Sequence, residues 1–168
     1  MKYRKSLNSD VDRIMDIMHQ AQEYLKSNNV DQWQDGYPQP DIILNDIKNK
    51  ESYVAEVDGI VAGTLVISFR GEETYDKIYE GEWLSDEDYC VVHRVAMDKN
   101  YRGKGLASDM LKYAEKLSKE KNIKSIKIDT HLDNKVMRGL ISKNGYKYCG
   151  IIYLNNGDKR VGYEKILE

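Results

Sequence analysis

The residues of this chain whose types and spacing best suit a chemical task form the run Arg102-Gly103-Lys104-Gly105-Leu106-Ala107. The run follows the apolar segment 90–97 and opens a segment with strong helical periodicity. A strand, a glycine-rich turn and a helix start together make an anion site, because the first N–H groups of a helix have no intrahelical acceptor. Glycine carries no Cβ, so the backbone can approach a phosphate closely. The run therefore predicts a phosphate-binding loop.

Two common phosphate-loop patterns are absent from the chain. The Walker pattern needs four residues between its first glycine and Gly-Lys-Ser/Thr, and the dinucleotide fingerprint needs a third glycine after Gly-x-Gly. A lone Gly-x-Gly also fits a plain turn before a helix. A general nucleotide-binding domain stays open as an alternative, although the missing Walker lysine motif argues against it.

More of a pattern follows the glycine run. Arg-x-x-Gly-x-Ala after a strand that ends Val95-Ala96-Met97 resembles the coenzyme A loop of the GNAT superfamily of acyl-CoA N-acyltransferases. The segment 126–130 resembles the next strand of that family. Similarity to its following helix and strand is carried by Asn134, Leu140 and Asn144-Gly145-Tyr146. The close resemblance covers about residues 90–154, and a looser one, in the order of elements, covers the whole chain.

The resemblance implies an N-acetyltransferase with acetyl-CoA as co-substrate and a primary amine of a small molecule or peptide as acceptor. In that family acyl-CoA lies between two central parallel strands that splay apart. Backbone groups of Val95, Ala96 and Met97 would then bind the pantetheine and the acetyl carbonyl. The N–H groups from Arg102 to Ala107, extending to Ser108, would bind the pyrophosphate. The side chains of Arg102 and Lys104 would either add charge there or face solvent. Asn134 would contact the pantetheine arm, or be a turn residue only.

One position departs from the family pattern. Many members carry a tyrosine after the motif leucine, where it protonates the leaving thiolate, but this chain has Ile141. The departure puts the usual acid in doubt and leaves coenzyme A binding untouched. It is also the one support for an alternative from another class, a catalytically silent CoA-binding regulatory module.

Acetyl transfer to an amine needs a proton acceptor, because an alkyl amine is neutral about once in 2,500 molecules at pH 7. By the two-residue period of a strand, His93 would share a face with Val95 and Met97. An imidazole suits this task near neutral pH. The alternative is an ordinary half-buried histidine. Glu80 and Glu82 are further candidates, unless they are only solvated loop acids.

The acceptor is expected to enter opposite the coenzyme A, under the first two helices and the loop before the strand 90–97. The aromatic residues expected there are Trp33, Tyr37, Tyr79 and Trp83. Aromatic rings suit a small polar amine, and they equally suit helix packing and loop anchoring.

These residues need a mixed α/β scaffold. Apolar spacing predicts helices over 10–26, 41–49, a segment from Leu106 and 134–144, the first with a capping-box-like start at Ser9 and Asp12 and the last capped by Asp133. Strands are expected at 53–57, 60–69, 90–97, 123–130, 146–154 and 159–166, after a first strand near the N-terminus. The β-α-β order predicts a single domain, residues 1–168, with a mixed sheet flanked by helices.

Composition narrows the function classes. The formal net charge is −2, from 26 basic and 28 acidic residues, so we expect no nucleic-acid partner and no attraction to an anionic membrane. No apolar run suggests a signal peptide or a membrane span, which favours a cytoplasmic protein. Cys90 and Cys149 have no metal-ligand spacing and are expected to be buried free thiols, so we expect no metal and transfer without an acetyl-enzyme. A homodimer is left open.

Overall fold

The order of elements makes an α/β chain with a seven-stranded mixed sheet. The computed structural model describes residues 1–168. Hydrogen bonding joins the strands in the order β1-β2-β3-β4-β5-β7-β6. The strands are β1 (Lys2–Lys5), β2 (Ser52–Val57), β3 (Ile60–Ser68), β4 (Tyr89–Met97), β5 (Ser125–Thr130), β6 (Lys147–Tyr153) and β7 (Lys159–Ile166). The helices are α1 (Val11–Ser27), α2 (Pro40–Lys48), α3 (Leu106–Glu120) and α4 (Lys135–Lys143), with short 3-10 turns η1 (Asn8–Asp10), η2 (Glu73–Tyr75) and η3 (Lys99–Tyr101). None of the helices is both long and apolar enough to cross a membrane.

The chain forms two compact units. The first contains Met1–Ile67 and Arg94–Met110, and the second contains Ser68–His93 and Leu111–Glu168. Strand β4 therefore begins in the second unit and ends in the first. The two units are described one at a time below.

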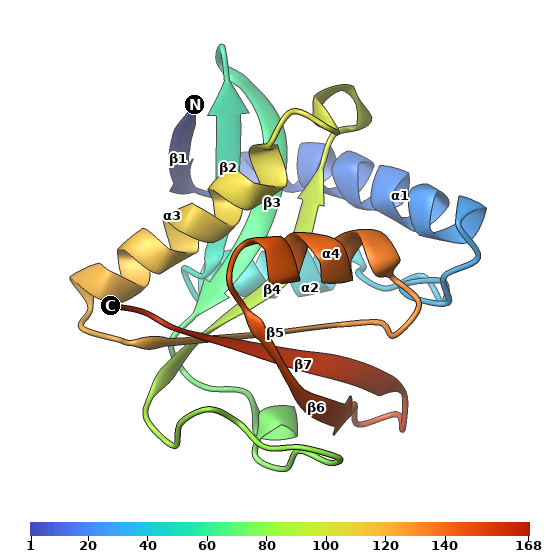
Figure 1. Cartoon of the computed structure of the whole chain (residues 1–168). Helices are drawn as coiled ribbons and strands as arrows, with labels where there is room; N and C mark the ends of the chain where they lie inside the picture. The colour runs from blue at the N-terminus through green and yellow to red at the C-terminus, as the bar shows by residue number, and fades with distance from the viewer. The chain divides into compact units, whose positions relative to one another are not determined.

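The first unit holds the antiparallel strands β1, β2 and β3 together with α1 and α2 (Figure 1). Asp58 and Gly59 both have positive φ, 52° and 77°, as a two-residue hairpin turn requires. The apolar stripe of α1 is buried in a core with Ile43 of α2 and Val54 of β2. The helix expected over 10–26 is thus confirmed, because its 3.6-residue period places one apolar face on the core.

The start of α1 differs from the expected capping box. Ser9 lies inside the turn η1, and the residue before α1 is Asp10, whose side chain does not cap that helix. The Asp10 carboxylate instead accepts the Leu7 N–H at 2.7 Å and binds Arg4 at 2.8 Å. Arg4 of β1 therefore holds the carboxylate that orders this turn. No local sequence pattern predicts this contact.

The second unit contains the start of β4, the strands β5, β7 and β6, and α4. The β5–β7 and β7–β6 pairs are antiparallel, and β6 and β7 form the hairpin seen in red in Figure 1. Strands β4 and β5 are parallel, and their pairing runs from Tyr89 and Ser125 to Val91 and Lys127. Both strands continue beyond that ladder, β4 to Met97 and β5 to Thr130. The parallel β4–β5 ladder therefore ends before either strand does.

The loop between β3 and β4 is fastened to β6. Tyr79 and Ile151 exchange backbone hydrogen bonds of 2.9 and 2.7 Å, so this segment covers part of the sheet edge. A Cβ on Gly81 would lie 1.9 Å from the carbonyl oxygen of Cys149, so only glycine fits there. The acidic loop 70–88 is therefore held against β6 of the second unit by backbone contacts at Tyr79 and Gly81.

Candidate active site

The glycine run forms the turn and helix start that the sequence predicts. Gly103 and Gly105 have φ of 75° and 82°, the left-handed region that favours glycine. The first helical hydrogen bond of α3 runs from the Asp109 N–H to the Gly105 carbonyl at 3.1 Å. The N–H groups of Leu106 and Ala107 precede that bond at the positive end of the helix dipole. Ser108 lies in the same first turn.

Arg102 takes a place that the sequence did not anticipate. Its guanidinium carbon lies 4.3 Å from the centre of the Tyr24 ring, and one of its nitrogens donates to the Gln20 carbonyl at 3.3 Å. Arg102 thus packs on α1. Lys104 is exposed, with its ammonium 5.9 Å from the Tyr101 ring. Only Lys104 keeps the two alternatives that the sequence left open.

A buried carboxylate ties α1 to the segment before the glycine run. Asp98 is 4% exposed and accepts the Asn100 N–H at 2.8 Å. It also accepts hydrogen bonds from Arg13 at 2.9 Å and Gln20 at 3.1 Å. Burial opposes ionisation, but these hydrogen bonds hold the pKa of Asp98 below its usual value. Gln20 further accepts the Lys99 N–H at 2.8 Å, so two side chains of α1 position η3.

At the end of β4 the backbone N–H and C=O groups point to opposite edges of the strand at successive residues. The Asp98 N–H donates to the Ala62 carbonyl of β3 at 2.8 Å. Successive residues of a strand direct their N–H and C=O groups to opposite edges. Ala96 therefore faces β3, whereas Val95 and Met97 direct theirs to the other edge. The three residues expected to bind pantetheine thus differ in backbone direction, Ala96 toward β3 and Val95 and Met97 away from it.

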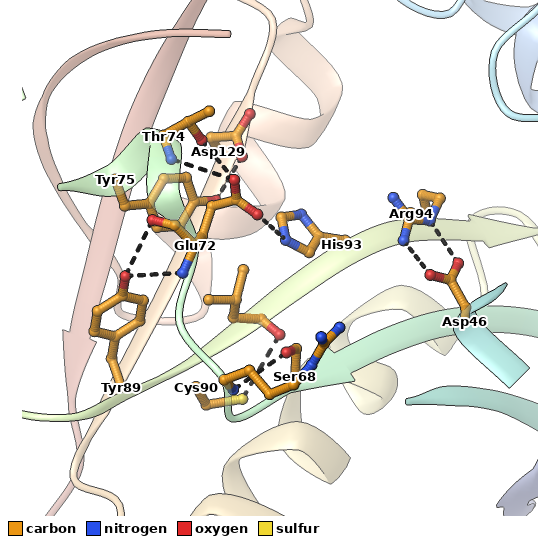
Figure 2. A network of polar contacts seen from close by, with 12 residues as sticks. Asp46, Ser68, Glu72, Thr74, Tyr75, Tyr89, Cys90, His93, Arg94 and Asp129 are labelled. Carbon is orange, nitrogen blue, oxygen red and sulfur yellow. Dashed lines mark hydrogen bonds and ion pairs between the residues drawn. The ribbon is translucent and has the colours of Figure 1, made fainter. Parts of the chain in front are cut away.

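Arg94 interrupts the regular geometry of β4. Its φ is 49°, which is rare for a residue with a side chain and costs on the order of 1–3 kcal/mol. Two hydrogen bonds to the Asp46 carboxylate, 2.9 and 2.5 Å long, hold its guanidinium, which also donates to the Tyr37 hydroxyl. Figure 2 shows the paired Arg94 and Asp46. Because of this positive φ, side chains do not alternate regularly from His93 across Arg94 to Val95. The two-residue period therefore no longer supports the expectation that His93 shares a face with Val95 and Met97.

His93 is paired with an acid that the sequence did not single out. Its Nε2 atom lies 3.3 Å from Oε2 of Glu72, and both side chains are partly buried (Figure 2). This hydrogen bond is the largest cause that lowers the pKa of Glu72 to about 2. Glu72 is one of many acids in the loop 70–88, and no spacing pattern marks it. The contact was missed because it joins residues twenty-one positions apart in the chain, 72 and 93.

Glu72 is held at both its side chain and its backbone. Its Oε1 atom accepts the Thr74 hydroxyl at 2.9 Å and the Thr74 N–H at 3.3 Å. The Tyr89 hydroxyl accepts the Glu72 N–H at 3.1 Å and donates to the Glu72 carbonyl at 3.3 Å. The carboxylate oxygen that faces His93 is therefore fixed in position.

Tyr75 forms the other side of this cluster. Its ring centre lies 6.4 Å from that of His93, and its hydroxyl donates to the Asp129 carboxylate at 2.5 Å. Burial, followed by the Asp129 charge, raises the pKa of Tyr75 well above its ordinary value. The phenol stays protonated, and it occupies one oxygen of Asp129 rather than of Glu72.

The other loop acids proposed from sequence lie in different surroundings. Glu80 and Glu82 are both exposed on the loop 70–88. The carboxylate brought to His93 in the second unit is that of Glu72.

The aromatic acceptor candidates divide between the two units. In the first unit, Trp33 packs against the α1 core and the Tyr37 hydroxyl binds Arg94. In the second unit, the Trp83 indole donates to the Tyr75 carbonyl at 2.8 Å, and its ring faces the Lys127 ammonium at 4.4 Å. These contacts are those of packing and anchoring residues.

Tyr79 is the most exposed of the four acceptor candidates, at 40%. Its ring meets that of Tyr153 edge-on, with the ring centres 5.1 Å apart.

Two residues of the α4 motif have defined local roles. The Asn134 side chain accepts the Met137 N–H at 3.1 Å and is the N-cap of α4, so the expected cap at Asp133 is wrong. Asn and Asp can both cap a helix, and α4 begins at Lys135, directly after Asn134. Ile141 is fully buried in the core. Its hydrocarbon side chain has no proton that it could give to a thiolate.

Comparisons with known proteins identify the family of this chain. The family model described as acetyltransferase (GNAT) family matches residues 16–146. This chain belongs to the GNAT family of acetyltransferases. Membership indicates acyltransferase activity for this GNAT protein. No curated protein sequence matched the chain.

Solved structures support the same assignment. A GNAT-family acetyltransferase from Streptococcus agalactiae is similar at 36% identity and a TM-score of 0.90, over 99% of this chain and 95% of that chain. A GNAT-family acetyltransferase from Listeria monocytogenes is 24% identical, with a TM-score of 0.77, over 99% and 94% of the two chains. The PaiA N-acetyltransferase of Thermoplasma acidophilum, solved in complex with coenzyme A, shares the fold at 16% identity and a TM-score of 0.74, over 98% of each chain.

Proposed function

We propose that residues 1–168 form one acetyltransferase domain that moves the acetyl group of acetyl-CoA to a primary amine of a small molecule or peptide. The observation that carries the proposal is the glycine loop, where Gly103 and Gly105 hold left-handed φ angles before the N-terminus of α3. The N–H groups from Arg102 to Ala107 would bind the pyrophosphate, with Ser108 beside them. The β4 residues Val95 to Met97 would bind the pantetheine and acetyl carbonyl. The acetyl-CoA site fits this chemistry without a metal.

The reaction proposed is direct attack of the amine on the thioester. The amine nitrogen forms a bond to the acetyl carbon, the carbon–sulfur bond breaks, and coenzyme A leaves as a thiolate. The amine proton passes to His93, and the thiolate takes a proton from water because Ile141 has none to give. His93 is the preferred proton acceptor, and Glu82 is the second candidate for that role.

Trp33 and Tyr37 of the first unit, and separately Tyr79 and Trp83 of the second, are proposed as candidates for contact with the acceptor. An aromatic ring beside a thioester would exclude water, which competes with the amine as nucleophile. Asn134, whose side-chain oxygen caps α4, is proposed to contact the pantetheine arm. The buried free thiols Cys90 and Cys149 support a reducing, cytoplasmic setting. Neither a nucleic-acid partner nor a membrane is part of the proposal, and a homodimer is compatible with it.

The test is acetyl-CoA turnover against a panel of amines, read by mass spectrometry of the acetylated product. His93→Ala should lower turnover more than coenzyme A affinity, and Trp33→Ala should mainly raise the KM for the acceptor. Tight acetyl-CoA binding with no product from any amine would favour the silent CoA-binding module instead. ATP competing as well as coenzyme A would refute the specific coenzyme A site.

A further inference from the structure

The contact between His93 and Glu72 assigns the two nitrogens of the imidazole different tasks. A carboxylate can only accept a hydrogen bond, so Nε2 must carry the proton that lies between it and Oε2 of Glu72. In a neutral imidazole the other nitrogen, Nδ1, then has the lone pair. The pairing therefore selects one tautomer and leaves Nδ1 as the proton-accepting atom.

The surroundings of Glu72 make this selection firm. Both of its carboxylate oxygens are engaged, Oε1 by Thr74 and Oε2 by His93. Its backbone exchanges two hydrogen bonds with the Tyr89 hydroxyl. Because Thr74 holds the Glu72 carboxylate and Tyr89 holds the Glu72 backbone, the oxygen that faces His93 stays in one position and favours one orientation of the ring.

The other polar groups around the ring do not compete for Nε2. Tyr75 packs on the ring but donates its proton to Asp129 of β5. Arg94, the next residue of β4, is bound to Asp46. Glu72 is thus the one carboxylate that faces the imidazole within hydrogen-bond distance in the second unit.

From this geometry we infer that Glu72 is a positioning residue for acetyl transfer, holding His93 as the Nε2–H tautomer so that Nδ1 takes the proton of the attacking amine. The inference rests on the proposed function, because it assigns the proton step of that reaction. In that step the nitrogen–hydrogen bond of the amine breaks as its nitrogen bonds to the acetyl carbon. Nδ1 gains the proton, and the sulfur keeps the electron pair of the broken carbon–sulfur bond. Glu72 neither gains nor loses a proton.

Glu72→Gln tests the inference because it replaces the carboxylate by a neutral amide of nearly the same shape. An amide can donate to an imidazole nitrogen as well as accept from it, so the variant no longer selects one tautomer. We expect kcat to fall about tenfold or more, with the coenzyme A Kd within about twofold of wild type, as for loss of an orienting carboxylate. Glu72→Asp, which keeps the charge, should recover part of the lost kcat. Glu73→Gln, an exposed neighbour with the same charge change, is the matched control and should retain wild-type kcat.

An NMR measurement separates this inference from the proposed function, because it needs no acceptor. The chain has three histidines, so His93→Ala identifies the His93 ring nitrogens in a nitrogen-15 spectrum. The wild type should show a proton on Nε2 and a lone pair on Nδ1, and the Glu72→Gln spectrum should show a mixture of both tautomers. Added imidazole should partly restore turnover to His93→Ala, since that substitution leaves a space for the missing ring.

The outcomes divide cleanly. Wild-type kcat in Glu72→Gln, or the same tautomer population in both proteins, overturns the positioning role. Failure of the wild type to acetylate any amine would refute the proposed function, and the tautomer spectra would still decide whether Glu72 orients His93.

Discussion

Replacement of Gly105 by valine should separate the stability of this protein from its affinity for acetyl-CoA. Gly105 has φ of 82° and directs the position of its absent Cβ into open space, with nothing within 4 Å. The Cβ of a valine there therefore meets no neighbouring atom, and the backbone penalty is the main cost expected in the folded chain. It also places two methyl groups where the expected phosphate would approach the loop.

The magnitude follows from the backbone. A β-branched residue held at positive φ costs on the order of 1–3 kcal/mol, and the loop can avoid that cost by leaving its binding conformation. If the loop relaxes, the apparent Kd rises by the inverse of the competent fraction. At about 1.4 kcal/mol for each factor of ten, the Kd for acetyl-CoA should rise about 5- to 150-fold. The methyl groups can only add to this loss.

The assay is the rise in melting temperature with acetyl-CoA concentration, supported by calorimetric titration. A ligand that binds the folded state stabilises it in proportion to the logarithm of its concentration over Kd, so the shift reports affinity. The matched control is Gly157→Val in the turn between β6 and β7, where φ is 87° and nothing lies within 4 Å of the missing Cβ. The control carries the same backbone penalty in a turn that the proposal does not connect with coenzyme A.

We expect both variants to melt lower than wild type, and only Gly105→Val to lose the acetyl-CoA shift. Equal acetyl-CoA shifts in wild type and Gly105→Val would refute the assignment of the pyrophosphate to this loop. An equal loss of the shift in both variants would show that backbone strain acts through global stability instead.

Three further predictions concern the second unit. The contact with His93 lowers the pKa of Glu72 from 4.5 to about 2, so the ionised carboxylate stabilises the fold above pH 4.5 and this contribution is lost as the pH falls toward 2. The difference in melting temperature between wild type and Glu72→Gln should therefore shrink between pH 4.5 and pH 2, and a constant difference would contradict this prediction. Burial raises the pKa of Cys90 to about 12 and that of Cys149 to about 11, so neither is a thiolate at neutral pH and Cys90→Ala should still turn over without an acetyl-enzyme; ping-pong kinetics, or an enzyme heavier by one acetyl group in intact mass, would argue otherwise. Gly81→Ala should lower the melting temperature sharply, because its Cβ would lie 1.9 Å from the Cys149 carbonyl, whereas Gly139→Ala in α4 meets nothing within 4 Å and should be neutral or stabilising.

Much of the fold could be predicted from the chain because its determinants are local. The period of Ile14, Met18 and Leu25 marks α1, and Asp58-Gly59 marks the hairpin between β2 and β3. The glycine run is local too, since its two left-handed residues and the helix start follow one another directly. Its likeness to a known coenzyme A loop could be recognised for the same reason.

Helix starts were less predictable, because a cap depends on one side chain and several neighbours are eligible. Asn134 caps α4 where Asp133 was expected, and Arg4 of β1 recruits Asp10 before α1. Both Asp and Asn have the capping chemistry, so composition alone does not choose between adjacent positions.

The chemistry around His93 was decided by tertiary structure. Sequence identified the histidine from its residue type and its place on a strand, but it did not identify Glu72, Tyr75 or Asp129 as its surroundings. Those contacts depend on how the loop 70–88 folds back on the sheet, which Gly81 and the Tyr79–Ile151 bridge fix through backbone contacts with β6.

The left-handed turn at Arg94 lay equally beyond sequence reasoning. A positive φ in the middle of a strand is unfavourable for an arginine taken alone, and it persists because Asp46 and Tyr37 hold the side chain. The sequence by itself therefore determined the elements, the glycine loop and the family, since each follows from neighbouring residues. Only the tertiary structure decided which carboxylate meets His93 and how β4 turns at the site, because long-range contacts outweigh local preference there.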